Sequence, residues 1–523
     1  MGSSDSRSSD VVSTDVGSSD FLQLDMGEAP VGGRADWLAD QLRRAIADGR
    51  LPVGSRLPAT RTLAADLRVS RGVVTEAYQR LGEDGQLAGR GRGGTIVVAA
   101  PLKAVRPAGA AYGSGPSAPR GGASSSGRDG SPHGAERTGP FVGPLGADVF
   151  DRLRAAPARI DLSPGVPDLA AFPRAAWLRA ERDVLADLPA GDFGYGDPRG
   201  APALRLAVAN WLARNRGVRA DPDEVLIVAG TAQALGLIAQ VLHRDGVREM
   251  AVEDPGSLGA RQHLGSRGLA TPPVPVDEEG VRVDALRASG APAVLLTPAH
   301  QFPTGVVLGG GRRRELMGWA ADGGLIVEDD YDAEHRYDRA PVPALRSLLP
   351  EQVCYAGSVS KLLAPALRVG WLLAPAGYRE ALADAKRFAD LGNAVLPQLV
   401  LARLMDSGEL ERRLRLLRRR HRRRRDAMIT AIRERLPGAV VHGAAAGLHL
   451  TVTFGAAGLG PAGTGIVDTE LAAAALSRGV KVQPLSWHRQ RPGPPGLVLG
   501  YAARTAGEIA DGVAVLGELL AGR

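Results

Sequence analysis

The segment VCYAGSVSKLLAPALRVGWLLAP, residues 353–375, places a lysine among phosphate-binding side chains and between two apolar runs. Lys361 follows Ser358 and Ser360, and Arg368 comes seven residues later. Hydroxyls and an arginine fork bind phosphate, and partial burial beside an arginine lowers the pKa of a lysine towards nucleophilic use. These residue types fit a phosphate-bearing aldehyde that condenses with the lysine, as pyridoxal 5′-phosphate (PLP) does. For this motif alone, a surface lysine is the alternative.

Two segments before it supply what such a cofactor needs. GGLIVEDDYDAEHRY (323–337) contains an apolar strand that ends in acids such as Asp329, and open α/β sheets bind ligands at the carboxyl ends of their strands. VLIVAGTAQALGLIAQVL (225–242) runs from a β-branched strand through a glycine turn into a helix. Thr231 and Ala232 lie at that turn, where a helix N-terminus suits phosphate.

Metal binding and disulfides are weakly supported. Asp329 and Asp330 are adjacent acids that suit a metal, but no histidine or acid cluster elsewhere in the sequence joins them, so no metal site is predicted. Cys354 is the single cysteine, too few for a Cys-based zinc site or an internal disulfide, and this fits a reducing cytosol.

The strings TPAHQFPTG, EDDYDAEHRY and GSVSKLLAPALRVG, in this order, make residues 160–520 similar to fold-type I, class I/II-like aminotransferases. The resemblance implies a large α/β domain of the PLP-dependent transferase fold. In it Lys361 forms the internal aldimine, Asp329 pairs with the pyridine nitrogen and Tyr331 lies near the cofactor O3′. His300 belongs to the signature and is counted with the cofactor site, beside it rather than as an acid–base group. The residues implied to hold the phosphate are Ser358, Ser360, Arg368, Thr231 and Ala232.

Three positions depart from that pattern. Ser257 stands where the family usually has a tyrosine stacked on the pyridine ring. Phe302 precedes PTG, where catalytic aminotransferases carry an asparagine that hydrogen-bonds O3′. No arginine is placed by its motif for a substrate carboxylate, and Arg504 is a candidate by position only.

The N-terminal part of the chain predicts a small DNA-binding domain. ADWLADQLRRAIADGRL, LPATRTLAADL and SRGVVTEAYQRLGEDG each have helical spacing, with a tight turn at RVS before the last helix. QLAGRGRGGTIVV then predicts a basic β-hairpin. Three helices and a hairpin make a small α+β winged helix-turn-helix, with the third helix in the major groove and the wing at the minor groove. The predicted DNA-binding residues are Arg61, Ser70, Arg71, Thr75, Arg90 and Arg92, with Ser70 as the N-cap of the third helix.

Charge agrees with a polyanionic partner for this domain. Residues 34–99 carry eleven arginines and seven acids, within a chain of net charge +7. An ordinary three-helix domain with scattered surface arginines is the alternative. GRLPVGSRLPATRTLAADLRVSRGVVTEAYQRLGEDGQL resembles the GntR-type winged helix along its whole length, except that Ala59 stands where that family usually has a helix-capping serine. Thr60 is the expected replacement cap.

Composition divides the 523 residues into a multidomain chain. Residues 1–33 are rich in Ser and Asp and predict a flexible tail, residues 34–99 form the winged helix, residues 100–155 predict a disordered Gly/Pro/Ser/Ala linker, and residues 156–523 form the PLP-binding effector domain. No apolar run is long enough to span a membrane. A run of ten arginines between Glu411 and Arg425 reads best as the solvated face of a helix.

A GntR-type winged helix followed by a linker and an aminotransferase-like domain is similar to the MocR-type (GabR/PdxR-like) transcriptional regulators. The resemblance implies a cytoplasmic, PLP-dependent regulator that binds operator DNA as a head-to-tail homodimer and senses PLP or an amino compound through an aldimine at Lys361. A genuine aminotransferase tethered to a DNA-binding module is the alternative, and net turnover stays undecided. A DNA-binding protein with an empty second domain is the third possibility.

Overall fold

The computed structural model describes residues 22, 24, 26–30, 33–83, 86–89, 94–98, 140–141, 145–337, 342–455 and 465–522. The chain divides into two compact units, residues 1–103 and residues 104–523.

The first unit is the winged helix that the sequence predicts. Its elements are α1 (Arg34–Ala47), α2 (Thr60–Asp66), α3 (Arg71–Glu83), β1 (Leu87–Gly89) and β2 (Thr95–Val97). The two strands pair antiparallel, with Ala88 opposite Ile96. Apolar side chains at helical spacing, including Leu38, Leu42 and Leu63, are fully buried and close a single core. The prediction of a small α+β domain is confirmed.

Two local predictions in this unit need correction. Thr60 does not cap α2: Ala59 is the N-cap residue, no side chain caps the helix, and Thr60 Oγ1 instead accepts from Arg71 Nε at 3.4 Å. The flexible tail predicted for residues 1–33 extends too far towards the C-terminus. Met26–Glu28 forms a short 3-10 helix, and Leu22 and Leu24 pack against the winged-helix core. Residues 1–21 lie outside the described residues.

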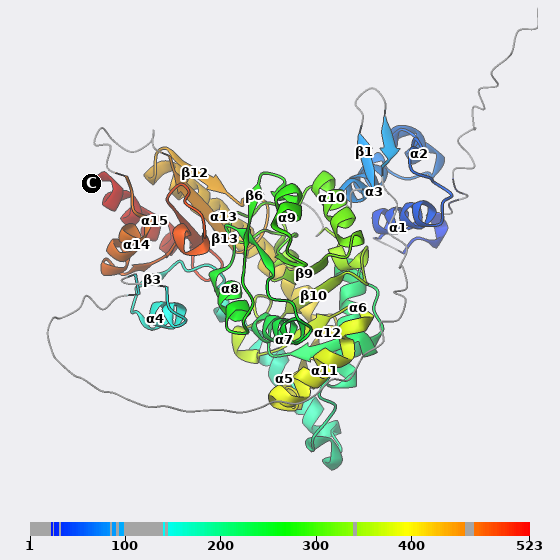
Figure 1. Ribbon diagram of the computed structural model, residues 1–523, viewed down its shortest axis with the longest axis horizontal. Helices are drawn as coiled ribbons and strands as arrows, with labels where there is room; N and C mark the ends of the chain where they lie inside the picture. The colour runs from blue at the N-terminus through cyan, green and yellow to red at the C-terminus, as the bar shows by residue number, and fades with distance from the viewer. Residues whose placement is uncertain are drawn as a thin grey trace, which may run out of the picture. The chain divides into compact units, whose positions relative to one another are not determined.

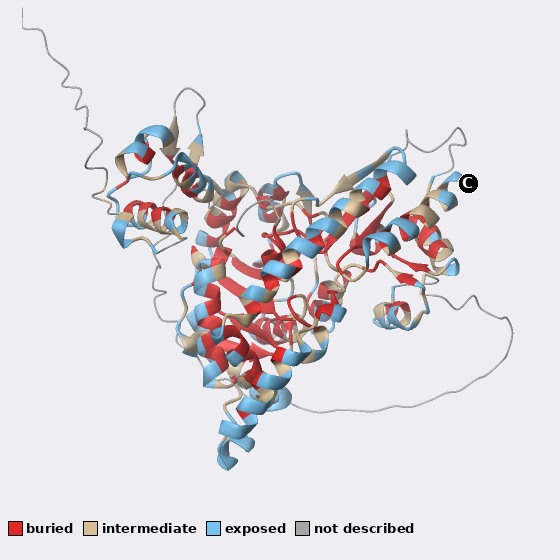
Figure 2. Ribbon diagram, turned by 180° about the vertical axis from the view of Figure 1, so that it is seen from behind, coloured by how far each residue is buried: buried red, intermediate tan, exposed pale blue. Residues whose placement is uncertain are grey.

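The second unit is built around a mostly parallel sheet (Figure 1). In the described part of the chain its strand order is β4-β11-β10-β9-β8-β5-β6-β7, and only β11 and β7 run antiparallel to their neighbours. The strands are β4 (Val225–Val228), β5 (Ala251–Asp254), β6 (Pro273–Asp277), β7 (Gly280–Val281), β8 (Ala293–Leu296), β9 (Leu325–Asp330), β10 (Val353–Ser358) and β11 (Gly370–Leu373). The side chains of β4, β8 and β11 are buried on both faces, which explains why these strands are continuous apolar runs in the sequence (Figure 2).

Helices cover the sheet and connect its strands. Their buried faces contribute to four apolar clusters: one around α7, one around α6 and α12, one that includes α9 and α10, and one between α5 and α12. The helices of this part are α5 (Arg174–Asp187), α6 (Pro202–Arg216), α7 (Thr231–Arg244), α8 (Leu258–Gly265), α9 (Val283–Ser289), α10 (Gly310–Ala321), α11 (Ala376–Asp390) and α12 (Val395–Asp406). A fold-type I aminotransferase-like domain is therefore confirmed as an α/β fold.

The C-terminal part adds a small sheet packed on long helices. The sheet has the order β12-β13-β16-β15, and a separate pair joins β3 to β14 in parallel. Its elements are β3 (Ile160–Asp161), β12 (Ala439–His442), β13 (His449–Phe454), β14 (Val480–Lys481), β15 (Gln483–Pro484), β16 (Gly496–Gly500), α13 (Glu409–Arg435), α14 (Asp468–Ser477) and α15 (Ala506–Ala521). These elements share one apolar core.

The predicted linker, residues 100–155, ends earlier than expected. Residues Val149–Ala155 form α4, in which Val149 and Leu153 are buried with the ring of Trp487. A helix of 7 residues is too short for its apolar spacing to be recognised in the sequence beside a Gly/Pro-rich stretch. Its apolar side packs on Leu258 and Trp487 of the same unit. Residues 101–139 lie outside the described residues. Among the described helices, none combines the length and the apolarity that crossing a bilayer requires.

Candidate cofactor and DNA sites

Lys361 lies in the turn after β10 and lines a cavity of about 860 Å³ in the large unit. Its Nζ donates to the main-chain oxygen of Gly165. Gly165 has φ +76°, and a Cβ there would lie 3.0 Å from Lys361 Nζ, so a glycine leaves the room that the amine needs. Burial lowers the pKa of Lys361, against the opposing charges of Asp332 and Asp329. This direction of shift is the one that nucleophilic use of a lysine amine requires.

The predicted phosphate ligands meet at one end of this cavity. Ser358 ends β10, Ser360 and Arg368 follow it, and α7 begins at Thr231, all at the carboxyl edge of the sheet. A Cβ on Gly230, the N-cap of α7, would lie 3.3 Å from Arg368 Nη1, which shows how closely the arginine approaches the helix start. The first amides of a helix have no acceptors within it, so hydroxyls, a guanidinium and free N–H groups converge here. The predicted residues that line the cavity are Thr231, Ala232, Ser358, Ser360, Lys361 and Arg368.

Asp329 brings a carboxylate into the same cavity from the end of β9. Its Oδ1 atom is buried and has no hydrogen-bond partner in the described structure. Burial raises the pKa of Asp329 to about 7, and the charges of Asp330 and Asp332 act in the same direction. An unpaired buried acceptor is costly, and a protonated ring nitrogen is the kind of donor that would satisfy it.

Tyr331 lines the cavity, whereas His300 is not among the described lining residues and contacts Tyr331 from behind. His300 is 1% exposed and does not line the cavity. Its Nδ1 is 3.0 Å from Asp332 Oδ2 and 3.0 Å from the Tyr331 hydroxyl. His300 therefore positions the side chain of Tyr331, which lines the cavity, while His300 itself does not line it. Asp332, which is also buried, was not singled out from the sequence; its place in the DDYDAEH string was the only available signal.

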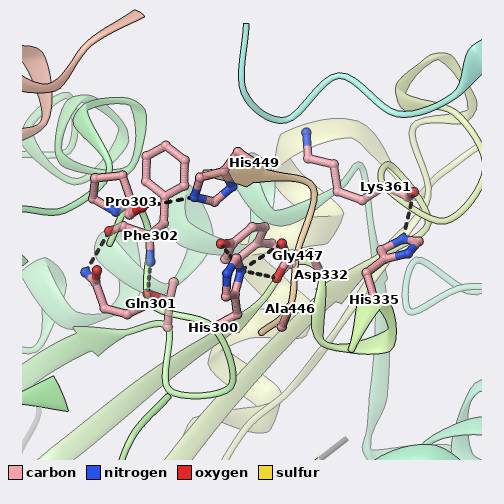
Figure 3. A network of polar contacts seen from close by, with 12 residues as sticks. His300, Gln301, Phe302, Pro303, Asp332, His335, Lys361, Ala446, Gly447 and His449 are labelled. Carbon is pink, nitrogen blue, oxygen red and sulfur yellow. Dashed lines mark hydrogen bonds and ion pairs between the residues drawn. The ribbon is translucent and has the colours of Figure 1, made fainter. Parts of the chain in front are cut away.

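Three buried groups near this point offer metal-ligand atoms. His300, Asp332 and His449 each present one such atom, and these atoms lie within 4.8 Å of one another. Two of these side chains are already hydrogen-bonded: His300 Nδ1 bonds Asp332, and His449 Nε2 lies 3.1 Å from the main-chain oxygen of Pro303, whereas His300 Nε2 has no hydrogen-bond partner in the described structure. The contacts therefore describe a hydrogen-bonded wall of the cavity (Figure 3).

The three departures from the aminotransferase pattern are placed as follows. Ser257 lines the cavity and caps α8, its Oγ accepting from Ala260 N at 3.2 Å. The ring of Phe302 also lines the cavity and meets His488 edge-on, with centroids 4.9 Å apart. Arg504 is not among the described residues of the lining: its Nη1 lies 3.3 Å from Glu508 Oε1, and its Nε donates to a main-chain oxygen.

The winged helix presents its predicted DNA-binding side chains to solvent. Arg61 lies in the first turn of α2, Ser70 precedes α3, and Arg71 and Thr75 lie on the first turns of α3; all four are exposed. Arg90 and Arg92 lie outside the described residues. Arg56, which the sequence analysis did not single out, approaches the base of the wing, where a Cβ on Gly94 would lie 3.0 Å from its Nε.

The arginine run forms part of α13, and half of it serves packing. Arg424 bonds Asp168 at 2.9 Å, and Arg418 Nε donates to the main-chain oxygen of Glu334. Arg415, Arg419 and others on the opposite side are exposed. A helix with one anchored and one solvated face agrees with the sequence interpretation.

Comparisons with known proteins match both units. Residues 34–97 match the family "Bacterial regulatory proteins, gntR family", and residues 158–513 match "Aminotransferase class I and II". The HTH-type pyridoxine biosynthesis transcriptional regulator PdxR of Corynebacterium glutamicum is 31% identical over 470 residues, which cover 89% of this chain and 91% of that protein. The probable rhizopine catabolism regulatory protein MocR of Rhizobium meliloti is 31% identical over 487 residues, 91% of each chain.

A solved structure supports the fold of the large unit. LysN, the alpha-aminoadipate aminotransferase from Thermus thermophilus, complexed with N-(5′-phosphopyridoxyl)-L-leucine, superposes with a TM-score of 0.63 and 29% identity, covering 71% of this chain and 94% of that chain. Fold and site thus define a winged-helix protein with an aminotransferase-type effector domain. Within that class the chain belongs to the MocR-type family, in which a gntR-type winged helix precedes a class I and II aminotransferase domain.

Proposed function

We propose that this protein is a transcriptional regulator that binds operator DNA through its winged helix and holds PLP in the cavity around Lys361. The proposal rests on one observation. The amine, hydroxyl, guanidinium and carboxylate groups that PLP binding needs line one cavity, in a chain that also contains a gntR-type domain. The relatives named PdxR and MocR are regulators, and the relative named LysN was solved with a phosphopyridoxyl compound.

The residues present fit this cofactor. Its aldehyde, when bound, condenses with primary amines. Lys361 supplies such an amine, Asp329 Oδ1 is an unpaired acceptor suited to a ring N–H, and the start of α7 with its neighbouring hydroxyls suits a phosphate. Tyr331 would face the ring oxygen while His300 fixes its hydroxyl. Each group in the set therefore has a role that its own geometry supports.

Sensing follows from the same arrangement. In the structure the Lys361 amine donates to the main-chain oxygen of Gly165. An amine that reacted with the cofactor in place of Lys361 would leave the lysine side chain free to make this contact. Gly165 belongs to the segment after β3, and β3 pairs with β14 of the C-terminal part. A change at the lysine would act on a segment that is joined to the C-terminal part, and coupling would further require that this part influence the winged helix.

We further propose a homodimer with a head-to-tail arrangement. Large apolar side chains are strongly exposed on two neighbouring segments of the large unit, the one before α6 and the end of α11: Tyr195 is 95% exposed, and Phe388 and Leu391 are 85% and 58% exposed. The segments touch, because a Cβ on Gly392 would lie 3.2 Å from Pro198 Cα. Such an apolar patch on a cavity-bearing domain is typical of a protein–protein contact. We also propose a cytoplasmic location, because the gntR-type domain implies a DNA partner.

An experiment separates the proposal from its rivals. Full-length protein mixed with PLP should turn yellow, and borohydride should fix the cofactor to the peptide that contains Lys361. The PLP-loaded protein should also bind the DNA upstream of its own gene. A catalytic aminotransferase, the second candidate, would use the same Lys361 amine and predicts steady turnover of amino-acid donors with 2-oxo acids. Labelling of a different lysine, or colourless protein, would refute the cofactor assignment.

A further inference from the structure

The short helix α4 joins the end of the linker to the cavity around Lys361. Along the chain it is the first described helix after the winged helix, and residues 101–139 between them lie outside the described residues. Its side chains that line the cavity are Phe150, Leu153 and Arg154. The chain that comes from the DNA-binding unit therefore forms part of the cavity wall where it enters the effector domain.

A small apolar cluster holds α4 on the effector domain. Val149 and Leu153 are buried there with Leu258 and Trp487, and Phe150 meets the Trp487 ring edge-on, with centroids 6.2 Å apart. This cluster is separate from the larger apolar cores of the domain. Figure 1 shows α4 beside β3 and away from the main sheet. The helix is thus docked on the domain through one small contact of its own.

Two side chains from other elements hold the main chain at the ends of α4. Gln262 Nε2 donates to the oxygen of Gly146, before the helix, at 2.9 Å, and Lys481 Nζ donates to the oxygen of Arg154 at 3.3 Å. Isolated helices shorter than about 12 residues are marginal in water, and α4 has 7 residues. We therefore expect the helix and its docking to form and to be lost together.

A ligand in the cavity would stabilise the docked helix. Phe150 and Leu153 present apolar surface to the cavity only while α4 is docked. A ligand that touches this surface binds the docked form more tightly and shifts the equilibrium by that difference in affinity. The other side of the contact is also linked to the cavity, because Leu258 packs on α4 and Ser257, one residue earlier, lines the cavity.

Undocking of α4 would lengthen the connection to the winged helix. Residues 146–155 would add about ten residues to it, which span up to roughly 35 Å when extended. The length of a connecting chain sets the effective concentration at which tethered modules reach their sites. In the homodimer proposed above, docking would therefore change how two winged helices engage two half-sites.

We propose that α4 is the element through which occupancy of the cavity acts on the winged helix. A ligand in the cavity keeps α4 docked, and the docked helix keeps the connecting chain short. The inference rests on the proposed function, because it takes a ligand in the Lys361 cavity and DNA binding as given. It assigns the transmitting step to a helix that supplies no group of the proposed cofactor site.

Hydrogen exchange of the full-length protein tests the docking. The probe is the borohydride-reduced adduct of PLP with butylamine, whose apolar tail suits Phe150 and Leu153. Exchange in peptides that cover residues 146–155 should slow by about threefold or more when the adduct is bound, because exchange there requires undocking. Peptides that cover α9 (Val283–Ser289), an equally short helix with no described residue in the cavity lining, should not change.

Val149→Ser separates ligand binding from its effect on DNA. Val149 is buried under α4 but is not among the described residues of the cavity lining. PLP uptake, followed by visible absorption, should therefore stay within about threefold of wild type. In gel shifts with the DNA upstream of its own gene, wild type should change its affinity by about threefold or more when the adduct binds. The variant with adduct should bind this DNA as wild type does without adduct.

Val283→Ser is the matched control for this variant. Val283 is the first residue of α9, as Val149 is of α4; both helices have 7 residues, and the two side chains are 2% and 0% exposed. The control should keep the response to the adduct. Thermal melting checks the folding of both variants.

Gln262→Ala carries the test if Val149→Ser does not fold. It removes only the hydrogen bond to the Gly146 oxygen and should reduce the response in part. Gln490→Ala is its control, because it removes a similar bond to the main-chain oxygen of Thr271. That control should respond as wild type does.

Three outcomes overturn the inference while PLP uptake and DNA binding persist. Unchanged exchange in residues 146–155 shows that the ligand does not stabilise α4. A wild-type DNA affinity that the adduct leaves unchanged removes the coupling. A full response in folded Val149→Ser and Gln262→Ala, or an equal loss in Val283→Ser, shows that the response does not pass through docking of α4. Failure of wild type to take up PLP overturns the proposed function as well.

Discussion

Lys361 is the residue on which the proposed sensor depends. Its amine touches the main chain of Gly165 and contributes little to the apolar core. We expect Lys361→Ala to fold, to lose covalent cofactor attachment after borohydride, and to lose its response to amines. Because the winged helix is a separate unit, DNA affinity in gel-shift titrations should stay within about threefold of wild type, a difference below about 1 kcal/mol. A variant that still responds to amines as wild type does contradicts the mechanism.

Asp329 should make the stability of the cofactor-free protein depend on pH. Burial raises its pKa to about 7 from 3.8, so the folded state holds the proton more tightly than the unfolded state, and this group costs stability as pH rises from about 4 to about 7. Asp329→Asn removes that cost. In urea denaturation we compare the unfolding free energy of Asp329→Asn with that of wild type. We expect the difference to increase in favour of the variant by an amount on the order of 1–4 kcal/mol between about pH 4 and pH 8.

The comparison isolates Asp329 because the other buried carboxyls with a pKa raised to about 7 by burial, Glu253, Glu328 and Glu334, are present in both proteins. Parallel pH profiles would contradict the assignment. The same variant should bind PLP roughly 10–100-fold more weakly, the loss expected for a hydrogen bond to a charged group. Equilibrium dialysis at about pH 8 measures it.

At the scale of single elements, β9 ends in a buried ion pair that anchors α6. Arg216 Nε and Asp330 Oδ2 are in contact, with side chains 0% and 1% exposed. Removing one member leaves the other charge buried, so Asp330→Ala should lower the unfolding free energy by about 3–5 kcal/mol. The control is Asp322→Ala, whose partner Arg287 is exposed; that loss should stay within about 1 kcal/mol. Equal losses in urea denaturation would show that burial of the first pair is unimportant.

The recognition helix α3 carries the element-scale prediction for DNA. Arg71, exposed in its first turn, should contact a base or phosphate, so Arg71→Ala should weaken operator binding by roughly 1–3 kcal/mol and reduce the dependence on salt. Arg50→Ala is the control, because Asp48 already pairs with Arg50 at 2.9 Å. The measurement is a gel shift at several salt concentrations. If Arg71→Ala and a double Arg90/Arg92 variant both bind the operator as tightly as wild type, the assignment of α3 and the wing to DNA binding is wrong.

For the whole molecule, the exposed apolar patch predicts a homodimer. A combined Tyr195→Ser and Phe388→Ser variant should shift the sedimenting species from dimer to monomer at micromolar concentration. Val440→Ser, on a side chain 52% exposed elsewhere in the same unit, should leave the dimer intact. A PLP-loaded wild-type monomer at that concentration contradicts the proposed assembly.

Local patterns in the sequence were sufficient for the elements and their order. The spacing of Leu38 and Leu42, the tight turn before α3, and the glycine that starts α7 each act within a few residues, so they can be recognised without tertiary contacts. The same holds for Ser358, which ends β10, and Lys361, which lies in the turn directly after it. The winged helix and the aminotransferase-like domain were predictable for this reason.

Tertiary structure alone decided which side chains meet. Ser163 and Lys481 line one cavity although most of the large unit lies between them in the chain. His300 and Asp332 form a hydrogen bond behind Tyr331. The helix α4 is recognised only from its packing against Trp487. Such contacts depend on the closure of long loops and on the packing of whole elements, whose energies are spread over many residues. No single motif in the sequence encodes them.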